Sequence, residues 1–142
     1  MTRRAVTFRI KATLSRLPAA QAFARNEIQR HCVTDAILNR LELVCEELFA
    51  NVANHAYPDG TGDVELSCMT GRDGAGNCYF CLRVRDWGLP FNPLSAPEPD
   101  LGADLDGRPE GGLGVLLVKR MADNCHYRRE DGANEFRACF KI

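Results

Sequence analysis

Four polar side chains recur at helical spacing within residues 43–57, LVCEELFANVANHAY. Glu47 and Asn51 are four residues apart, so a helix places them on one face, and Asn54 and His55 extend this stripe by another turn. A carboxylate one turn from an amide oxygen can act as a base toward a hydroxyl group and bind a hard metal ion. The stripe is therefore a candidate catalytic site, although Glu and Asn at this spacing also occur on ordinary helix surfaces.

Residues 37–52, which overlap this stretch, predict a helix with one buried face. Apolar residues recur at spacings of three and four along the side opposite the polar stripe, namely Ile37, Leu41, Val44, Leu48 and Val52. Thr34 or Asp35 is the expected N-cap, and the turn Tyr57-Pro58-Asp59-Gly60 should follow the end of the helix.

Length and composition are typical of one globular domain. The chain has 142 residues, 45% hydrophobic and 26% charged. A net charge of −1 gives no electrostatic reason to expect direct nucleic-acid binding or attachment to an anionic membrane. Arg3-Arg4 is not followed by an apolar segment, and no apolar run approaches membrane-spanning length. We therefore expect a cytoplasmic protein.

The seven cysteines favour reduced thiols over a disulfide framework. Their number is odd, no signal peptide is evident, and five of them lie in apolar-periodic segments, where they should be buried: Cys32, Cys45, Cys68, Cys125 and Cys139. Cys78 and Cys81 have C-x-x-C spacing, but in a strand they point to opposite faces. A metal or redox site formed by these two cysteines is therefore disfavoured.

Hydrophobic periodicity predicts the remaining elements. They are a strand over 5–12, a helix from Pro18 to about His31, a hairpin of strands 63–70 and 78–85, a third helix after the glycines near 112, and a closing hairpin of 125–129 and 135–142.

Two further segments carry possible chemistry. Asp86 ends a predicted strand, and the Gly- and Pro-rich run that follows cannot continue it; a lid is expected over about 92–110. The segment 110–115, EGGLGV, then begins a helix, where backbone N–H groups can bind an anion. It matches neither a P-loop nor a dinucleotide-binding fingerprint, and a glycine pair that merely starts a helix is the alternative.

Three segments in this order, EELFANVANHAYPDG, RVRDWGLPFNP and EGGLGVLLVKRMAD, resemble the N, G1 and G2 boxes of the GHKL superfamily. Within it, the chain is most similar to the stand-alone anti-sigma factor serine kinases of the RsbW and SpoIIAB group, and its DGANEF segment is also similar. The resemblance covers nearly the whole chain. It implies one ATP-binding kinase domain over 1–142 with the Bergerat fold, an α/β two-layer sandwich whose mixed, largely antiparallel sheet is covered on one face by three helices.

The resemblance also implies roles for individual residues. Glu47 matches the general base, Asn51 a Mg²⁺ ligand, and Asp86 the carboxylate that accepts a hydrogen bond from the adenine amino group. Gly88 matches the glycine that lets the base approach the backbone, and Pro90 replaces a glycine that many members carry. The other expected nucleotide-binding residues are Asn54 and His55 in the N box and Gly111, Gly112, Leu113, Gly114 and Val115 in the G2 box.

The function implied by the resemblance is that of an anti-sigma factor kinase. Such a protein binds Mg²⁺ and ATP, sequesters a sigma factor and phosphorylates a serine of a STAS-domain antagonist, and we expect a homodimer. A non-catalytic nucleotide-binding module that controls a partner is the alternative. A separate histidine-kinase-type catalytic domain is less favoured, because His31 is followed by Cys32-Val33 and no phosphoacceptor helix precedes Glu47.

Overall fold

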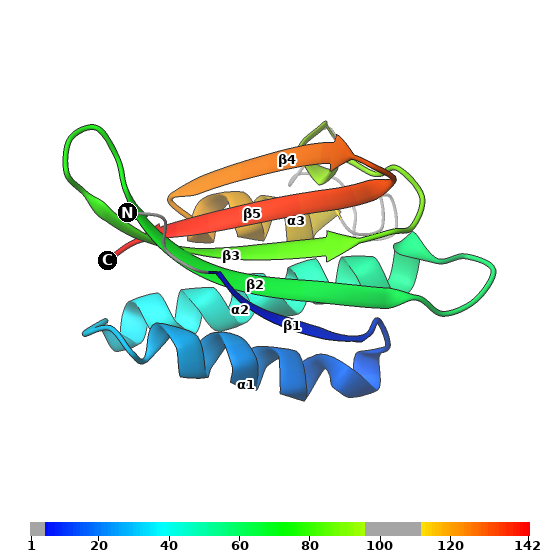
Figure 1. Cartoon of the computed structure of the whole chain (residues 1–142), viewed down its shortest axis with the longest axis horizontal. Coiled ribbons are helices and arrows are strands. Elements are labelled where there is room, and N and C mark those ends of the chain that lie inside the picture. Colours follow the sequence, from blue (N-terminus) through cyan, green and yellow to red (C-terminus); the bar gives the residue numbers. More distant parts are fainter. Residues whose placement is uncertain (1–4, 96–111) are drawn as a thin grey trace.

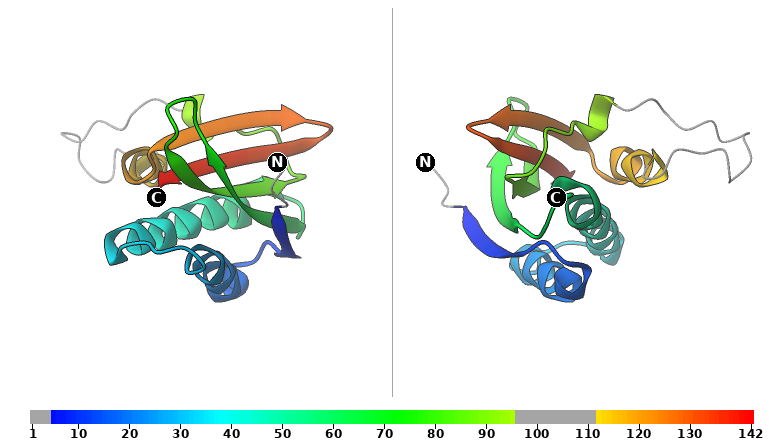
Figure 2. Two further views of the ribbon diagram at one scale, coloured as in Figure 1. Left: turned by 60° about the vertical axis from the view of Figure 1, so that its left-hand side comes forward. Right: turned by 90° about the vertical axis from the view of Figure 1, so that its right-hand side faces the viewer.

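Among the residues that the structure describes, a five-stranded sheet and three helices on one of its faces form two layers (Figures 1 and 2). The computed structural model describes residues 5–95 and 112–142. The elements are β1 (Val6–Lys11), a 3₁₀ turn (Leu14–Arg16), α1 (Leu17–Ile28), α2 (Asp35–Asn51), a π-helical turn (Val52–Ala56), β2 (Asp63–Arg72), β3 (Cys78–Asp86), a second 3₁₀ turn (Pro93–Ser95), α3 (Gly112–Met121), β4 (Asn124–Glu130) and β5 (Ala133–Lys141). Most of the predicted lid, residues 96–110, and Gly111 lie outside the described residues.

The strand order is β1-β2-β3-β5-β4, and every pairing among the described strands is antiparallel. The predicted two-layer sandwich with a largely antiparallel sheet is confirmed. The parallel component expected of a mixed sheet is not found in these strands. β3 and β4 run in the same direction, but β5 lies between them and pairs with both.

The core lies between the sheet and α2, which packs against both α1 and α3. Alternate residues of the central strands are buried on the helix side, as period-two patterning requires. The buried residues of these elements include Val64, Leu66, Leu82, Val84, Ala20, Ala24, Ile28, Leu41, Val44 and Leu48. Thr34 is the N-cap of α2, and its Oγ1 accepts a hydrogen bond from the Ile37 N–H at 3.3 Å. No helix in the described ranges is long and apolar enough to cross a membrane.

Two helix ends differ from prediction. α1 ends at Ile28 rather than near His31, because the amide of His31 bonds to the Ile28 carbonyl in a tight turn. α2 ends at Asn51 and continues as a π-helical turn over Val52–Ala56. π-Helical turns are rare and often occur at functional sites.

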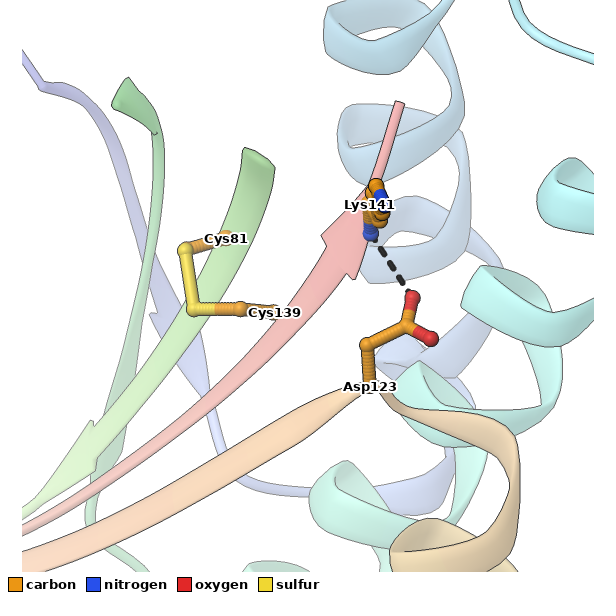
Figure 3. Close-up of a disulfide and its surroundings, with 4 residues drawn as sticks. All are labelled: Cys81, Asp123, Cys139 and Lys141. Atoms are coloured by element: carbon orange, nitrogen blue, oxygen red, sulfur yellow. Dashed lines mark hydrogen bonds between the residues drawn. A yellow bond between two sulfur atoms is a disulfide. The ribbon is translucent and has the colours of Figure 1, made fainter. Parts of the chain in front are cut away.

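The prediction of reduced, buried thiols is wrong for Cys32 and Cys139, and Cys125 is only half-buried. Cys81 and Cys139 form a disulfide between β3 and β5 (Figure 3), and Cys32 is exposed. The strand register places Cys81 directly opposite Cys139, a proximity that spacing along the sequence does not indicate. Cys45 and Cys68 are buried thiols as predicted, and burial raises the pKa of each to about 12.

Candidate functional site

A cavity lies where α2 and its π-helical turn meet β3, β5 and the segment after β3. It encloses about 450 Å³, part of it open to solvent. Its lining residues are Leu48, Asn51, Val52, His55, Ala56, Val84, Asp86, Leu89, Phe91, Pro93, Tyr127, Asn134 and Phe136. An apolar wall with a few convergent polar groups is the usual composition of a small-molecule site.

Asp86 is the charged group buried in this wall. It is the last residue of β3 and its exposed fraction is 6%. Its Oδ1 accepts hydrogen bonds from the Gly88 N–H at 2.9 Å and from the Asn134 Nδ2 at 3.0 Å. Both bonds use Oδ1, so the carboxylate is held in one orientation while Oδ2 takes part in neither bond.

Asn134 connects Asp86 to the segment that follows it. Its Nδ2 donates to Asp86 and to the Leu89 carbonyl at 2.7 Å, while its Oδ1 accepts from the Phe91 N–H at 3.2 Å and the Tyr127 hydroxyl at 2.6 Å. The sequence prediction missed this residue. Alternation with Phe136 and Ala138 on the buried side of β5 would have identified it as a polar residue on a core-facing position.

Replacing Asn134 by Ala should lower stability by about 2–3 kcal/mol, because it removes four hydrogen bonds and leaves buried groups without partners. Urea unfolding measures this change. Asn39→Ala, at an exposed position of α2, is the control and should change stability by less than about 0.5 kcal/mol. Equal effects of the two substitutions would contradict the assigned role of Asn134.

Gly88 brings the segment after β3 against the end of the π-helical turn. A Cβ at position 88 would lie 2.1 Å from the Ala56 carbonyl oxygen, which also accepts a hydrogen bond from the Leu89 N–H at 3.0 Å. The side chain of Arg129 donates to the Gly88 carbonyl at 2.8 Å. Gly88 does not line the cavity, so its contribution is to permit this close backbone approach.

Of the polar stripe on α2 and its continuation, only part faces the cavity. Asn51 is half-buried and lines it, and His55 lies at its margin with its ring centroid 6.4 Å from that of Phe91. Asn54 is exposed and is not a lining residue, because the stripe has turned toward solvent by this position. Glu47 lies one turn before Asn51, beyond the cavity lining.

The environment of Glu47 favours its protonated form. The side chain is half-buried, and burial, followed by repulsion from Glu46, raises the pKa of the Glu47 carboxyl. A carboxylate with a raised pKa is a stronger base than an ordinary one and is better matched to accepting a proton near neutral pH.

The remaining predicted residues in the described ranges follow β3 or begin α3. Pro90 lies between the lining residues Leu89 and Phe91 but does not itself line the cavity. Gly112, Leu113, Gly114 and Val115 form the first turn of α3, as the predicted glycine-to-helix junction requires. α3 packs beside α2, the helix that carries Glu47 and Asn51.

The protein is a two-layer sandwich with a buried carboxylate in an apolar cavity, beside a helix that carries a carboxylate and a carboxamide one turn apart, as we predicted for a nucleotide-binding domain. The chain belongs to the family described as histidine kinase-like ATPase domain, whose model matches residues 10–140. Membership confirms the predicted superfamily and fold and implies ATP as the ligand.

The chain is similar to one known protein and to one solved structure. One is the serine/threonine-protein kinase BtrW of Bordetella bronchiseptica (strain ATCC BAA-588 / NCTC 13252 / RB50), 28% identical over 95 residues that cover 66% of this chain and 63% of BtrW. The other is the crystal structure of the RsbU and RsbW domains of Rv1364c from Mycobacterium tuberculosis. That match has a TM-score of 0.58 and 12% identity, and it covers 97% of this chain and 32% of the other, so this similarity is one of fold.

Proposed function

We propose that this protein is an ATP-dependent protein serine kinase of the anti-sigma factor type. It would act as a homodimer in the cytoplasm, sequester a sigma factor, and phosphorylate a serine of a STAS-domain antagonist. The observation that carries the proposal is the position of Asp86 in an apolar cavity beside the helix that bears Asn51 and Glu47. The similarity to BtrW, itself a serine/threonine-protein kinase, supports the choice of reaction.

Adenine recognition is assigned to Asp86. Because Gly88 and Asn134 both hold Oδ1, the second oxygen would accept a hydrogen bond from the adenine amino group. Guanine carries an acceptor oxygen where adenine has this amino group, so a carboxylate would repel it. The apolar lining residues, among them Val52, Val84 and Phe136, would pack against the base.

Phosphoryl transfer is assigned to residues of α2 and α3. Glu47 would accept the proton of a serine hydroxyl as its oxygen bonds to the γ-phosphorus and the bond to the leaving ADP oxygen breaks. The backbone amides of Gly112, Leu113 and Gly114, at the start of α3, would bind the phosphates. His55 would contribute to the margin of the pocket. Asn54, Pro90, Gly111 and Val115 remain proposed as flanking residues of the nucleotide.

The side chain of Asn51 is suited to bind Mg²⁺. The described residues hold no cluster of three or more His, Cys, Asp or Glu side chains able to bind a metal. Mg²⁺ on a nucleotide commonly needs only one or two protein oxygens, since phosphates and waters complete its octahedron. The half-buried carboxamide of Asn51, on the cavity wall, meets that need, and a bound Mg²⁺ would neutralise phosphate charge.

The raised pKa of Glu47 predicts a pH dependence. kcat/KM should fall as the pH drops through this pKa, because a protonated carboxyl cannot accept the serine proton. Glu46→Gln removes a repelling charge and lowers the pKa of Glu47, so the acid limb of the profile should move to lower pH. Phosphorylation rates measured from acidic to neutral pH follow this limb. Asp59→Asn, at an exposed turn, should leave it in place; an unmoved limb in Glu46→Gln would contradict the assignment.

The adenine contact is tested by Asp86→Asn, which preserves side-chain shape and an oxygen to accept from Gly88 and Asn134. The new amide would present a donor to the adenine amino group, so ATP affinity should fall at least about tenfold. Calorimetric titration with ATP and GTP measures this loss. Wild-type protein should prefer ATP, and an unchanged ATP affinity in Asp86→Asn would refute the proposed base contact.

A further inference from the structure

The Cys81–Cys139 disulfide lies on the sheet face opposite the helices. The neighbouring side chains in the same strands, Phe80 and Leu82 in β3 and Ala138 and Phe140 in β5, are buried toward the helices. Alternation along a strand therefore turns the two cysteines to the other face. Figure 3 shows the bridge joining two adjacent strands, away from the helices.

A hollow opens over this bridge. It encloses about 610 Å³ including open solvent, and both cysteines line it together with Gly71, Arg72, Asp73, Tyr79 and Asn124. Cys81 is partly exposed, and Gly71 and Asn124 at the rim are exposed. Among the described residues, the hollow leaves an approach by which a small molecule can reach a sulfur atom.

Three basic residues lie on the same face of the sheet as the disulfide. Arg83 is two residues from Cys81, and Arg137 and Lys141 are each two residues from Cys139, so alternation places all three on the cysteine face. The acidic groups nearby are Asp73 in the hollow and Asp123, whose carboxylate accepts a hydrogen bond from the Lys141 backbone N–H at 2.7 Å (Figure 3). Cationic neighbours stabilise thiolates and attract anionic reagents.

This environment differs from that of the cysteines that face the core. Cys45 and Cys68 are buried in the core, and desolvation raises the pKa of both thiols to about 12, so they remain protonated. Buried thiols of this kind are unreactive.

We propose that Cys81 and Cys139 form a reversible dithiol–disulfide site that reacts with small anionic thiols of the glutathione class. The thiolate of one such molecule attacks a sulfur of the bridge, and a mixed disulfide forms as the other cysteine leaves as a thiolate and takes up a proton. A second thiol attacks the mixed disulfide and releases the second cysteine as a thiol. The small thiol is oxidised to its own disulfide, two electrons reduce the protein, and the reverse sequence closes the bridge.

The disulfide and the proposed nucleotide site share the same pair of strands, β3 and β5. Asp86 and Asn134 are also directly opposite in β3 and β5, five residues along each strand from Cys81 and Cys139. A covalent link at one end of this strand pair restricts register slippage at the other, where the Asp86–Asn134 hydrogen bond is made. Opening the bridge should therefore lower the melting temperature, by roughly 5–10 °C.

The test is a redox titration of the folded 142-residue chain in buffers of defined glutathione to glutathione-disulfide ratio. After acid quenching and alkylation in denaturant, peptide mass spectrometry reports the thiol fraction at each cysteine. We expect one reversible two-electron transition shared by Cys81 and Cys139, while Cys45 and Cys68 stay reduced throughout. The readout requires no nucleotide, so its outcome is independent of the proposed kinase activity.

Matched variants complete the test. Cys81→Ser and Cys139→Ser should each abolish the transition and the dependence of the melting temperature on glutathione ratio, whereas Cys78→Ser, in the same strand, should retain both. Absence of a bridge at every ratio, reduction only after denaturation, or pairing of Cys81 with a different cysteine would each overturn the proposal.

Discussion

Replacing Glu47 by Gln is expected to slow serine phosphorylation by about 10²–10⁴-fold while changing ATP affinity by less than about threefold. The carboxamide has nearly the same size as the carboxylate but cannot accept the serine proton. Glu47 lies one turn before Asn51 and does not line the cavity, so adenine binding does not depend on it. Single-turnover phosphorylation and calorimetric ATP titration separate the two effects.

Glu46→Gln is the matched control, since it removes an adjacent, exposed carboxylate from the same helix turn. It should keep near-wild-type activity at neutral pH. Full activity in Glu47→Gln would show that Glu47 is not the general base. If no phosphorylation occurs with wild-type protein either, while nucleotide still controls partner binding, the protein is a non-catalytic binding module.

Replacing Gly88 by Ala is expected to lower stability by about 1–3 kcal/mol and ATP affinity by more than about tenfold. The added Cβ would lie 2.1 Å from the Ala56 carbonyl oxygen and 2.7 Å from the Ala56 Cβ. Backbone cannot yield as a flexible side chain does, so the segment after β3 must move away from the π-helical turn. That movement would strain the Gly88–Asp86 and Leu89–Ala56 hydrogen bonds that hold one wall of the cavity.

Gly60→Ala serves as the control, because a Cβ there meets no atom within 4 Å. Urea unfolding and ATP titration of the two variants give the comparison. If Gly88→Ala binds ATP as well as Gly60→Ala does, the close approach at residue 88 is not needed to shape the site.

The sequence was sufficient to predict the elements whose periodicity is strong. Val64, Leu66 and Cys68 alternate as a half-buried strand should, and all three are buried in β2. The capping position of Thr34 and the turn before β5, where Asp131 and Gly132 both have positive φ, also follow from local chemistry. Within the site, Asn51 and Asp86 both line the cavity, while their roles toward Mg²⁺ and adenine stay predictions.

What the sequence could not predict depends on pairing between distant strands. Asp86 pairs with Asn134, and Cys81 with Cys139, across β3 and β5. This register is not encoded by any local sequence pattern. The π-helical turn over Val52–Ala56 also escaped prediction, because apolar spacing cannot distinguish it from a further α-helical turn. This turn includes Asn54, which is exposed and does not line the cavity, and Ala56, whose carbonyl oxygen lies against Gly88.

The central claim is tested most directly by following the γ-phosphate. The protein, Mg²⁺ and γ-labelled ATP are incubated with proteins that it captures from an extract of its host, and the labelled residue is identified by mass spectrometry. We predict label on a serine of a captured STAS-domain protein with wild type and none with Glu47→Gln. Label on histidine, or serine label that persists undiminished in Glu47→Gln, would contradict the proposed mechanism.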